Sequence, residues 1–184
     1  MALKYAGIEL EHREIELRNK PKSMLQVSPK GTVPVLCVGE LILEQSLDIL
    51  HWALDQADPA SWRLTDEASA IAWVSKNDGP FKKLLDQYKY LERYPELNQE
   101  EVLAQAMDLM LIPMESALLS TPYLMGEKMT WVDIAIFPFI RQFAMVDLEK
   151  FNGLPLPALK RWLNHHLESG LFLSAMDKYP TWKD

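Results

Sequence analysis

The chain has 184 residues, of which 48% are hydrophobic and 24% charged, a composition typical of a globular protein with a substantial core. Its net charge of −7, with no cluster of Lys and Arg, argues against nucleic acid or an anionic membrane surface as a partner. No run of the sequence approaches the ~20 consecutive apolar residues of a membrane span. The N-terminus does not resemble a signal peptide, and we therefore expect a cytoplasmic protein with no membrane partner.

The N-terminal part of the sequence predicts short helices and strands. Residues 1–7 are typical of the last turns of a helix, in which Gly7 takes the left-handed C′ position and Ile8 contacts Leu3. Residues 12–17 alternate between polar and apolar at their end and predict a strand, and residues 21–27 predict a short helical turn.

Residues 28–36, Ser-Pro-Lys-Gly-Thr-Val-Pro-Val-Leu, are the most informative stretch. Gly31 permits a tight turn of positive φ, and Pro34 enters an apolar strand without an N–H for a ladder. The Val33–Pro34 bond is a candidate cis peptide bond. In that form, the backbone of Val33 is open to an extended ligand, which would pair with it like an added strand. The stretch therefore predicts a binding turn for a small peptide.

A hairpin and a helix follow this turn. Residues 34–38 and 41–43 predict two strands joined at Gly39-Glu40, and residues 46–56 carry apolar side chains at helical spacing. Gln45 and Ser46 lie where that helix begins, so a carboxamide, a hydroxyl and unpaired N–H groups favour a carboxylate ligand. Taken alone, the motif is better explained as an ordinary entry into a strand, with Ser46 as a helix cap. The single cysteine, Cys37, lies in an apolar run, where we expect a small buried side chain.

After a linker at residues 57–63, the sequence predicts only helices. One begins near Thr65 and Glu67, and residues 78–80, Asp-Gly-Pro, should kink or interrupt it. Residues 98–119 carry an apolar stripe, and Pro113 should bend this helix.

Two further features belong to the helical region. Thr130 and Asp133 have the spacing of a capping box, and the run from Ile134 to Ile140 contains no polar side chain. We therefore expect a helix buried on every face at the centre of this region. His165 and His166 lie near the end of a helix over 156–167, and we expect both on the surface.

The binding turn, the Gln45-Ser46 pair and the Thr130-x-x-Asp133 box resemble the glutathione S-transferase family over nearly the whole chain. The resemblance implies an α+β thioredoxin-like N-terminal domain at residues 1–56, the linker at 57–63 and an all-α C-terminal domain at 64–184. It implies that Pro34 is the family's cis-proline and that the backbone of Val33 pairs with the cysteinyl residue of glutathione. Gln45 and Ser46 would then hold the γ-glutamyl end. Family members are commonly homodimers that conjugate glutathione, their co-substrate, to small hydrophobic electrophiles.

The resemblance also implies that the chain starts within the family's first helix. The central strand and the first turn of that helix carry the family's thiol-activating Tyr, Ser or Cys, and we find no counterpart here. Three explanations are open: a start further upstream, a strand supplied by another chain, or a rearranged domain without transferase chemistry. We assign no catalytic residue and no metal ligand.

In the family, one helix borders the substrate cleft. Five residues lie on the corresponding helix here, and a helix with one packed and one solvated face explains them better than a role in binding substrate. They are Asp78, Phe81, Lys82, Leu85 and Tyr88. Two functions stay open at this point. One is a glutathione transferase, which the Val33-Pro34 and Gln45-Ser46 pairs favour. The other is a non-catalytic interaction or dimerisation module of the same fold, which the missing activating segment favours.

Overall fold

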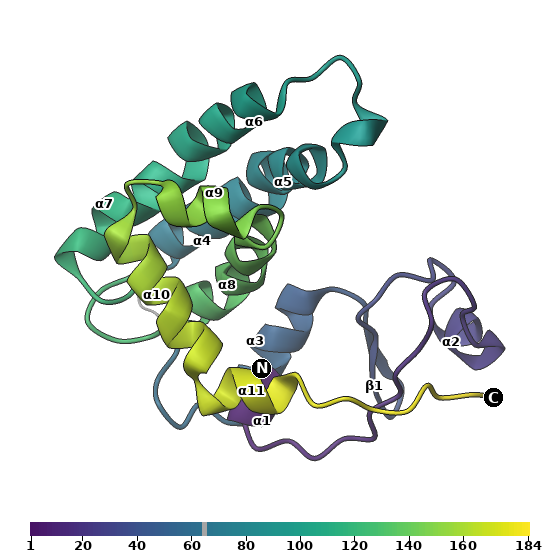
Figure 1. Cartoon of the computed structure of the whole chain (residues 1–184). Coiled ribbons are helices and arrows are strands. Elements are labelled where there is room, and N and C mark those ends of the chain that lie inside the picture. The colour runs from purple at the N-terminus through teal and green to yellow at the C-terminus, as the bar shows by residue number, and fades with distance from the viewer. Residues whose placement is uncertain (64–65) are drawn as a thin grey trace. The chain divides into compact units, whose positions relative to one another are not determined.

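The computed structural model describes residues 1–63 and 66–184, and the contacts within it divide into two units (Figure 1). The first unit joins Met1–Ala60 to Gly170–Asp184, and the second is Ser61–Ser169. The sequence-based boundaries assign the last residues of the chain to the helical domain, whereas their contacts are with the N-terminal residues. The helix start expected at Thr65 lies outside the described residues.

The first unit contains short helices and one hairpin. Its elements are α1 (Ala2–Tyr5), α2 (Lys22–Val27), β1 (Leu36–Val38), β2 (Leu41–Leu43), α3 (Ser46–Gln56) and α11 (Gly170–Ala175). The predicted end of α1 is confirmed, because the amide of Gly7 donates to the carbonyl of Lys4 and the amide of Ile8 to that of Leu3. Gly7 has a φ of 68°, so this ending is a Schellman motif.

The predicted hairpin is confirmed. Strands β1 and β2 pair antiparallel with Leu36 opposite Leu43 and Cys37 opposite Ile42, and Gly39 turns with a φ of 60°. Burial of Cys37 was a wrong prediction, because this side chain and that of Ile42 are both exposed. Among the described residues the sheet has two strands of three residues each, and a ladder this small leaves one face open.

The strand predicted over residues 12–17 is also wrong. Within the described residues, this segment forms only isolated bridges, between Glu14 and Thr181 and between Glu16 and Asn19. Alternating side chains do not make a strand unless a neighbouring chain supplies a row of hydrogen-bond partners.

The second unit consists of helices in its described part. They are α4 (Glu67–Lys76), η1 (Asn77–Phe81), α5 (Lys82–Lys89), η2 (Leu91–Arg93), α6 (Gln99–Ala106), η3 (Met107–Leu111), α7 (Ile112–Ser120), α8 (Trp131–Ala144), α9 (Leu148–Gly153) and α10 (Pro157–Glu168). Asp66 caps α4, since its side chain accepts a hydrogen bond of 3.1 Å from the amide of Ser69.

Two prolines coincide with π-helical turns. The chain runs from α4 to α5 through η1, which contains Pro80, and from α6 to α7 through η3, two residues before Pro113. A proline removes one amide and crowds the carbonyl four residues earlier, and a widened turn accommodates both effects. The expected disturbances at residues 78–80 and at Pro113 are thus local π-helical turns within continuous helices.

The core of the second unit surrounds α8, which contacts α4, α5 and α10. Ile136, Phe137 and Ile140 are fully buried. The expectation that α8 is buried on every face is wrong at Pro138, which is exposed.

One helical stretch of the described residues, Gln99–Ser120, is long and apolar enough to cross a membrane, with a mean hydropathy of 1.4. Length and composition alone are weak evidence, since the core helix of a globular unit meets the same test. Within its own unit the stretch packs on α5 and α10.

Candidate functional site

The binding turn is anchored at Gly31. Gly31 is buried with a φ of 59°, and a Cβ at this position would lie 3.0 Å from Cδ2 of Leu25. Its positive φ therefore favours glycine, and a larger residue would also have to displace the end of the Leu25 side chain. The predicted cis bond between Val33 and Pro34 is confirmed, and the Val33 side chain is 48% exposed.

The second part of the predicted site is the start of α3. Gln45 is the N-cap residue, with φ −115° and ψ 137°, and Ser46 is the first residue of the helix. Both are exposed, and within the described residues their side chains form no hydrogen bond. Ser46 therefore does not act as the helix cap, and no side chain in the described part of the chain accepts a hydrogen bond from the amides of the first turn.

The hairpin leads from the turn to the start of α3. Its ladder ends at the pair Leu36 and Leu43, two residues after Pro34 and two residues before Gln45. A hydrogen bond of 2.5 Å from Oγ of the buried Ser28 to Oε1 of Glu44 ties the turn to the residue before Gln45.

Glu44 is the ionisable group nearest to this junction in sequence. The hydrogen bond from Ser28 lowers the pKa of the Glu44 carboxyl, and Lys30 adds to this effect from 3.4 Å. Glu44 is thus held as a carboxylate acceptor for the turn, while Gln45 and Ser46 keep their polar groups available.

The junction offers three kinds of polar group to a ligand: the backbone of Val33, which is an exposed residue, the side chains of Gln45 and Ser46, and the N-terminal amides of α3. Such a set suits an extended peptide that carries a carboxylate at one end. Two cavities in the helical unit, of about 550 and 70 Å³, include none of these residues. Among the described residues, no group of three or more His, Cys, Asp or Glu side chains is arranged to hold a metal ion.

The helix expected to border a substrate cleft has one packed and one solvated face, as its sequence predicts. Phe81, Leu85 and Tyr88 are buried, whereas Asp78 and Lys82 are exposed. Tyr88 stacks on Phe143 of α8 with ring centroids 4.6 Å apart.

Among the described residues of the helical unit, three buried polar ones were not foreseen: Asn77, Glu115 and His166. His166 is only 1% exposed, so its expected surface position is wrong, while His165 beside it is exposed as predicted. Trp162, one turn before His166 on α10, is the aromatic neighbour that the sequence itself places beside the ring, and Phe137 of α8 packs near it in the structure. Glu115 is also buried, and nothing in its spacing indicates this.

Two protein-family models match this chain. The glutathione S-transferase N-terminal domain family matches residues 1–62, and the C-terminal domain family matches residues 92–169. Glutathione S-transferase U19 of Arabidopsis thaliana is 30% identical over 181 residues, which cover 91% of this chain and 78% of that protein.

Solved structures show the same fold. The ternary complex of BphK, a bacterial glutathione S-transferase, has a TM-score of 0.76 at 22% identity. The match covers 95% of this chain and 90% of the BphK chain. A glutathione transferase family member from Pseudomonas fluorescens, solved with two glutathione bound, has a TM-score of 0.77 at 21% identity, covering 94% and 84%.

The fold is therefore a thioredoxin-like N-terminal domain with a small sheet, followed by an all-α domain. The chain belongs to the glutathione S-transferase family.

Proposed function

We propose that this chain binds glutathione at the junction of the turn and α3. The backbone of Val33, set by the bond to Pro34, pairs with the cysteinyl residue of the tripeptide. Gln45, Ser46 and the first amides of α3 hold the γ-glutamyl carboxylate. Glutathione is the co-substrate, and no metal takes part.

The observation that best supports this proposal is the register of the hairpin. The ladder ends at Leu36 and Leu43, each two residues from the proposed site, and the same register carried outward would set the Val33-Pro34 pair opposite the Gln45-Ser46 pair. A tripeptide is long enough to contact both, because consecutive residues of an extended chain advance about 3.3 Å.

In this proposal the protein conjugates glutathione to small hydrophobic electrophiles. The reaction needs the thiolate of glutathione, whose sulfur forms a bond to the electrophilic carbon. In a substitution the leaving group departs as an anion, and in an addition the product takes up a proton. Since no residue is assigned to activating the thiol, binding and conjugation are separate questions for experiment.

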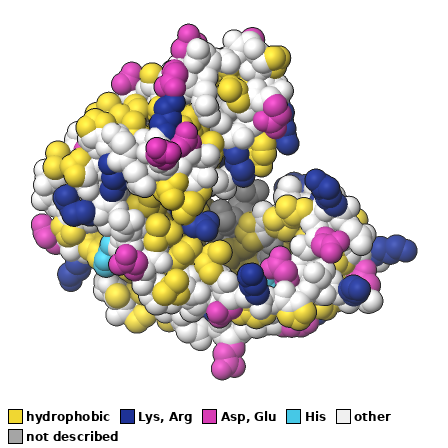
Figure 2. All heavy atoms as spheres, in the orientation of Figure 1, with side chains coloured by type: hydrophobic (Ala, Val, Ile, Leu, Met, Phe, Trp, Pro, Cys, Tyr) yellow, Lys and Arg dark blue, Asp and Glu magenta, His cyan; other side chains and the backbone are white. Residues whose placement is uncertain are grey.

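The setting of the reaction is also part of the proposal. We infer a cytoplasmic homodimer, because this is common in the family and because a single cysteine suits a reducing compartment. Basic and acidic side chains are interspersed on the visible faces of both units (Figure 2), which offers nucleic acid no basic patch there.

The site is tested by replacing its two side chains together. The double variant Gln45→Ala, Ser46→Ala should raise the calorimetric Kd for glutathione by about tenfold or more, because hydrogen bonds to charged groups contribute about 1.5–3 kcal/mol each. The matched control is Gln56→Ala, Ser75→Ala, which removes an exposed glutamine and an exposed serine elsewhere.

Ligand variants locate the effect. The dipeptide Cys-Gly lacks the γ-glutamyl residue, so its weaker binding should be equal for the double variant and the unmodified protein. An unchanged Kd for glutathione in the double variant would reject the assigned site. Turnover of a chlorodinitrobenzene-type electrophile then separates a transferase from a glutathione-binding or interaction module without catalysis.

A further inference from the structure

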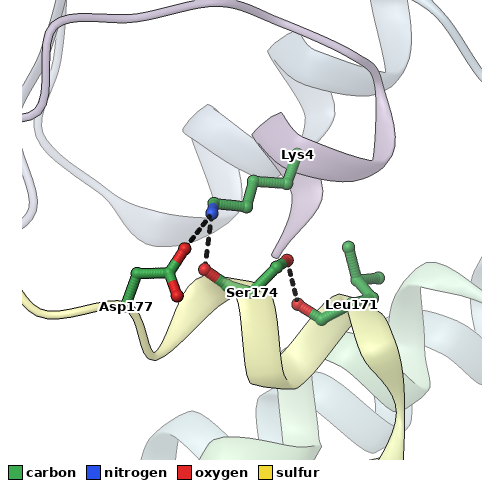
Figure 3. Close-up of polar contacts among 4 residues, drawn as sticks. All are labelled: Lys4, Leu171, Ser174 and Asp177. Atoms are coloured by element: carbon green, nitrogen blue, oxygen red, sulfur yellow. Dashed lines mark hydrogen bonds and ion pairs between the residues drawn. The ribbon is translucent and has the colours of Figure 1, made fainter.

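The last eight residues of the chain run along the N-terminal residues of the same unit. We call residues 177–184 the C-terminal strap. At its start, Nζ of Lys4 in α1 contacts the carbonyl of Ser174 at 2.5 Å and the carboxylate of Asp177 at 3.2 Å (Figure 3). The strap therefore leaves α11 from an anchored position.

The middle of the strap lies on residues 12–14. The rings of His12 and Tyr179 stack with centroids 4.0 Å apart, and the Arg13 guanidinium lies 4.5 Å from the centre of the Trp182 ring. The amide of Trp182 donates to the carbonyl of Glu14 at 2.7 Å, next to a parallel bridge between Glu14 and Thr181. Aromatic, cationic and backbone contacts thus follow one another along the strap.

The end of the strap caps α2. A carboxylate oxygen of Asp184 accepts from the amide of Lys22 at 2.7 Å, and the other accepts from Oγ of Ser23 at 2.5 Å and from its amide at 3.4 Å. The local N-cap residue of α2 is Pro21, which makes no side-chain cap. A helix of six residues is marginal by itself, so a cap from elsewhere in the chain has a large effect on it.

Helix α2 in turn contacts residues that lie next to the candidate site in the sequence. The amide of Ser28 donates to the carbonyl of Met24 at 2.8 Å, and Leu25 packs against Gly31. Ser28 also holds Glu44, the residue before Gln45. A continuous set of contacts therefore connects Asp184 to both halves of the glutathione junction.

We propose that the C-terminal strap is a positioning device for the glutathione site, with Asp184 as its positioning residue. The docked strap caps α2 and fixes the turn that presents Val33, whereas a released strap leaves both loose. Most of the strap is exposed and outside regular structure, so docking and release interconvert without disturbing a core. This proposal rests on the proposed function of the site.

The first test needs no ligand. In Asp184→Ala, amide hydrogen exchange measured by NMR should accelerate about tenfold for Lys22 and Ser23, and it should also accelerate in the turn at residues 28–33. A chain ending at Met176 should show the same change. The control is Lys183→Ala, the adjacent strap residue, whose side chain makes no hydrogen bond or ion pair among the described residues. Unchanged exchange in α2 overturns docking of the strap, and faster exchange confined to α2 overturns its positioning role.

The second test uses glutathione. The Kd in Asp184→Ala should rise about threefold or more, while Lys183→Ala should match the unmodified protein. A Kd that stays unchanged despite faster exchange overturns the positioning role. If the unmodified protein does not bind glutathione, the proposed function fails, and exchange in the turn alone then decides for or against positioning by the strap.

Discussion

Asp133 is a fully buried carboxyl group surrounded by donors. It accepts hydrogen bonds from the amide and hydroxyl of Thr130, each at 3.0 Å, from the amide of Leu124 at 3.0 Å and from Nε1 of Trp162 at 2.9 Å. Burial raises the pKa of the Asp133 carboxyl, and the four hydrogen bonds oppose that rise. The predicted capping box is confirmed, and Asp133 additionally joins α8 to α10.

Substitution of this carboxyl should destabilise the protein. Asp133→Asn replaces an acceptor oxygen by an NH₂ group that faces other donors, which should lower the free energy of unfolding by about 2–4 kcal/mol. Trp162→Phe removes one donor and should cost about 1–3 kcal/mol. Urea denaturation followed by circular dichroism measures both. Asp108→Asn, at an exposed position, is the control and should have little effect on the free energy of unfolding. An effect of Asp133→Asn as small as that of this control would contradict the role of the Asp133 hydrogen bonds.

Among the elements, α10 has an unusual start. Its N-cap residue is Leu156, which has no polar side chain, and its first residue is Pro157, which has no N–H. The buried carboxylate of Glu115 on α7 supplies the missing acceptors. It accepts hydrogen bonds from the amide of Ala158 at 3.0 Å and from the amide of Leu159 at 2.8 Å. A cap from a neighbouring helix thus fixes both the start of α10 and its packing against α7.

Glu115→Gln should weaken this junction by about 1–3 kcal/mol in the free energy of unfolding. The amide keeps one acceptor but turns an NH₂ group toward a helix amide, and the favourable charge at the helix N-terminus is lost. Urea denaturation is again the measurement. Glu101→Gln, at an exposed position of α6, should stay within about 0.5 kcal/mol of the unmodified protein. A Glu115→Gln variant as stable as this control would show that the cap is dispensable.

Elements whose signals are local could be predicted well from the sequence. The second strand of the hairpin and the 46–56 helix have the predicted bounds, and the first strand begins at Leu36 instead of residue 34, because turn glycines and helical spacing act within a few residues. The same holds for the confirmed cis bond before Pro34. The strand over 12–17 failed because its bridges in the described residues are isolated, one to the nearby Asn19 and one to Thr181 at the opposite end of the chain. Contacts with distant segments also decide the burial of His166 and Glu115, and local residue spacing does not indicate such contacts.

At the scale of the whole molecule, the two units differ in how the chain builds them. The helical unit is one continuous segment, Ser61–Ser169, whereas the first unit joins both ends of the chain. The first unit is therefore complete only when residues 170–184 contact residues 1–60. This arrangement explains why the C-terminal residues, which carry little hydrophobic periodicity, contact residues 4–23 so extensively.

The stability of the helical unit in acid should depend on His166. Its ring lies 4.7 Å from that of Trp162 and 5.1 Å from that of Phe137, and its Nε2 has no hydrogen-bond partner among the described residues. Burial, with a smaller contribution from His165, lowers the pKa of His166 to about 4 from 6.5. Above pH 6.5 the ring is neutral in both folded and unfolded states and adds no pH dependence.

Below pH 6.5 the His166 ring is protonated in the unfolded chain but stays neutral in the folded chain until the pH approaches about 4. The free energy of unfolding therefore falls as the pH falls toward about 4. The full loss is about 3 kcal/mol, at about 1.4 kcal/mol per pH unit. Urea denaturation at several pH values should show this slope, and His166→Gln should remove it. His165→Gln, at the exposed neighbour, should retain it. Asp133 has a raised pKa and acts in the opposite direction, but it is present in all three proteins, so the difference between their profiles isolates His166. Equal profiles for His166→Gln and the unmodified protein would mean that the buried ring accepts its proton without cost.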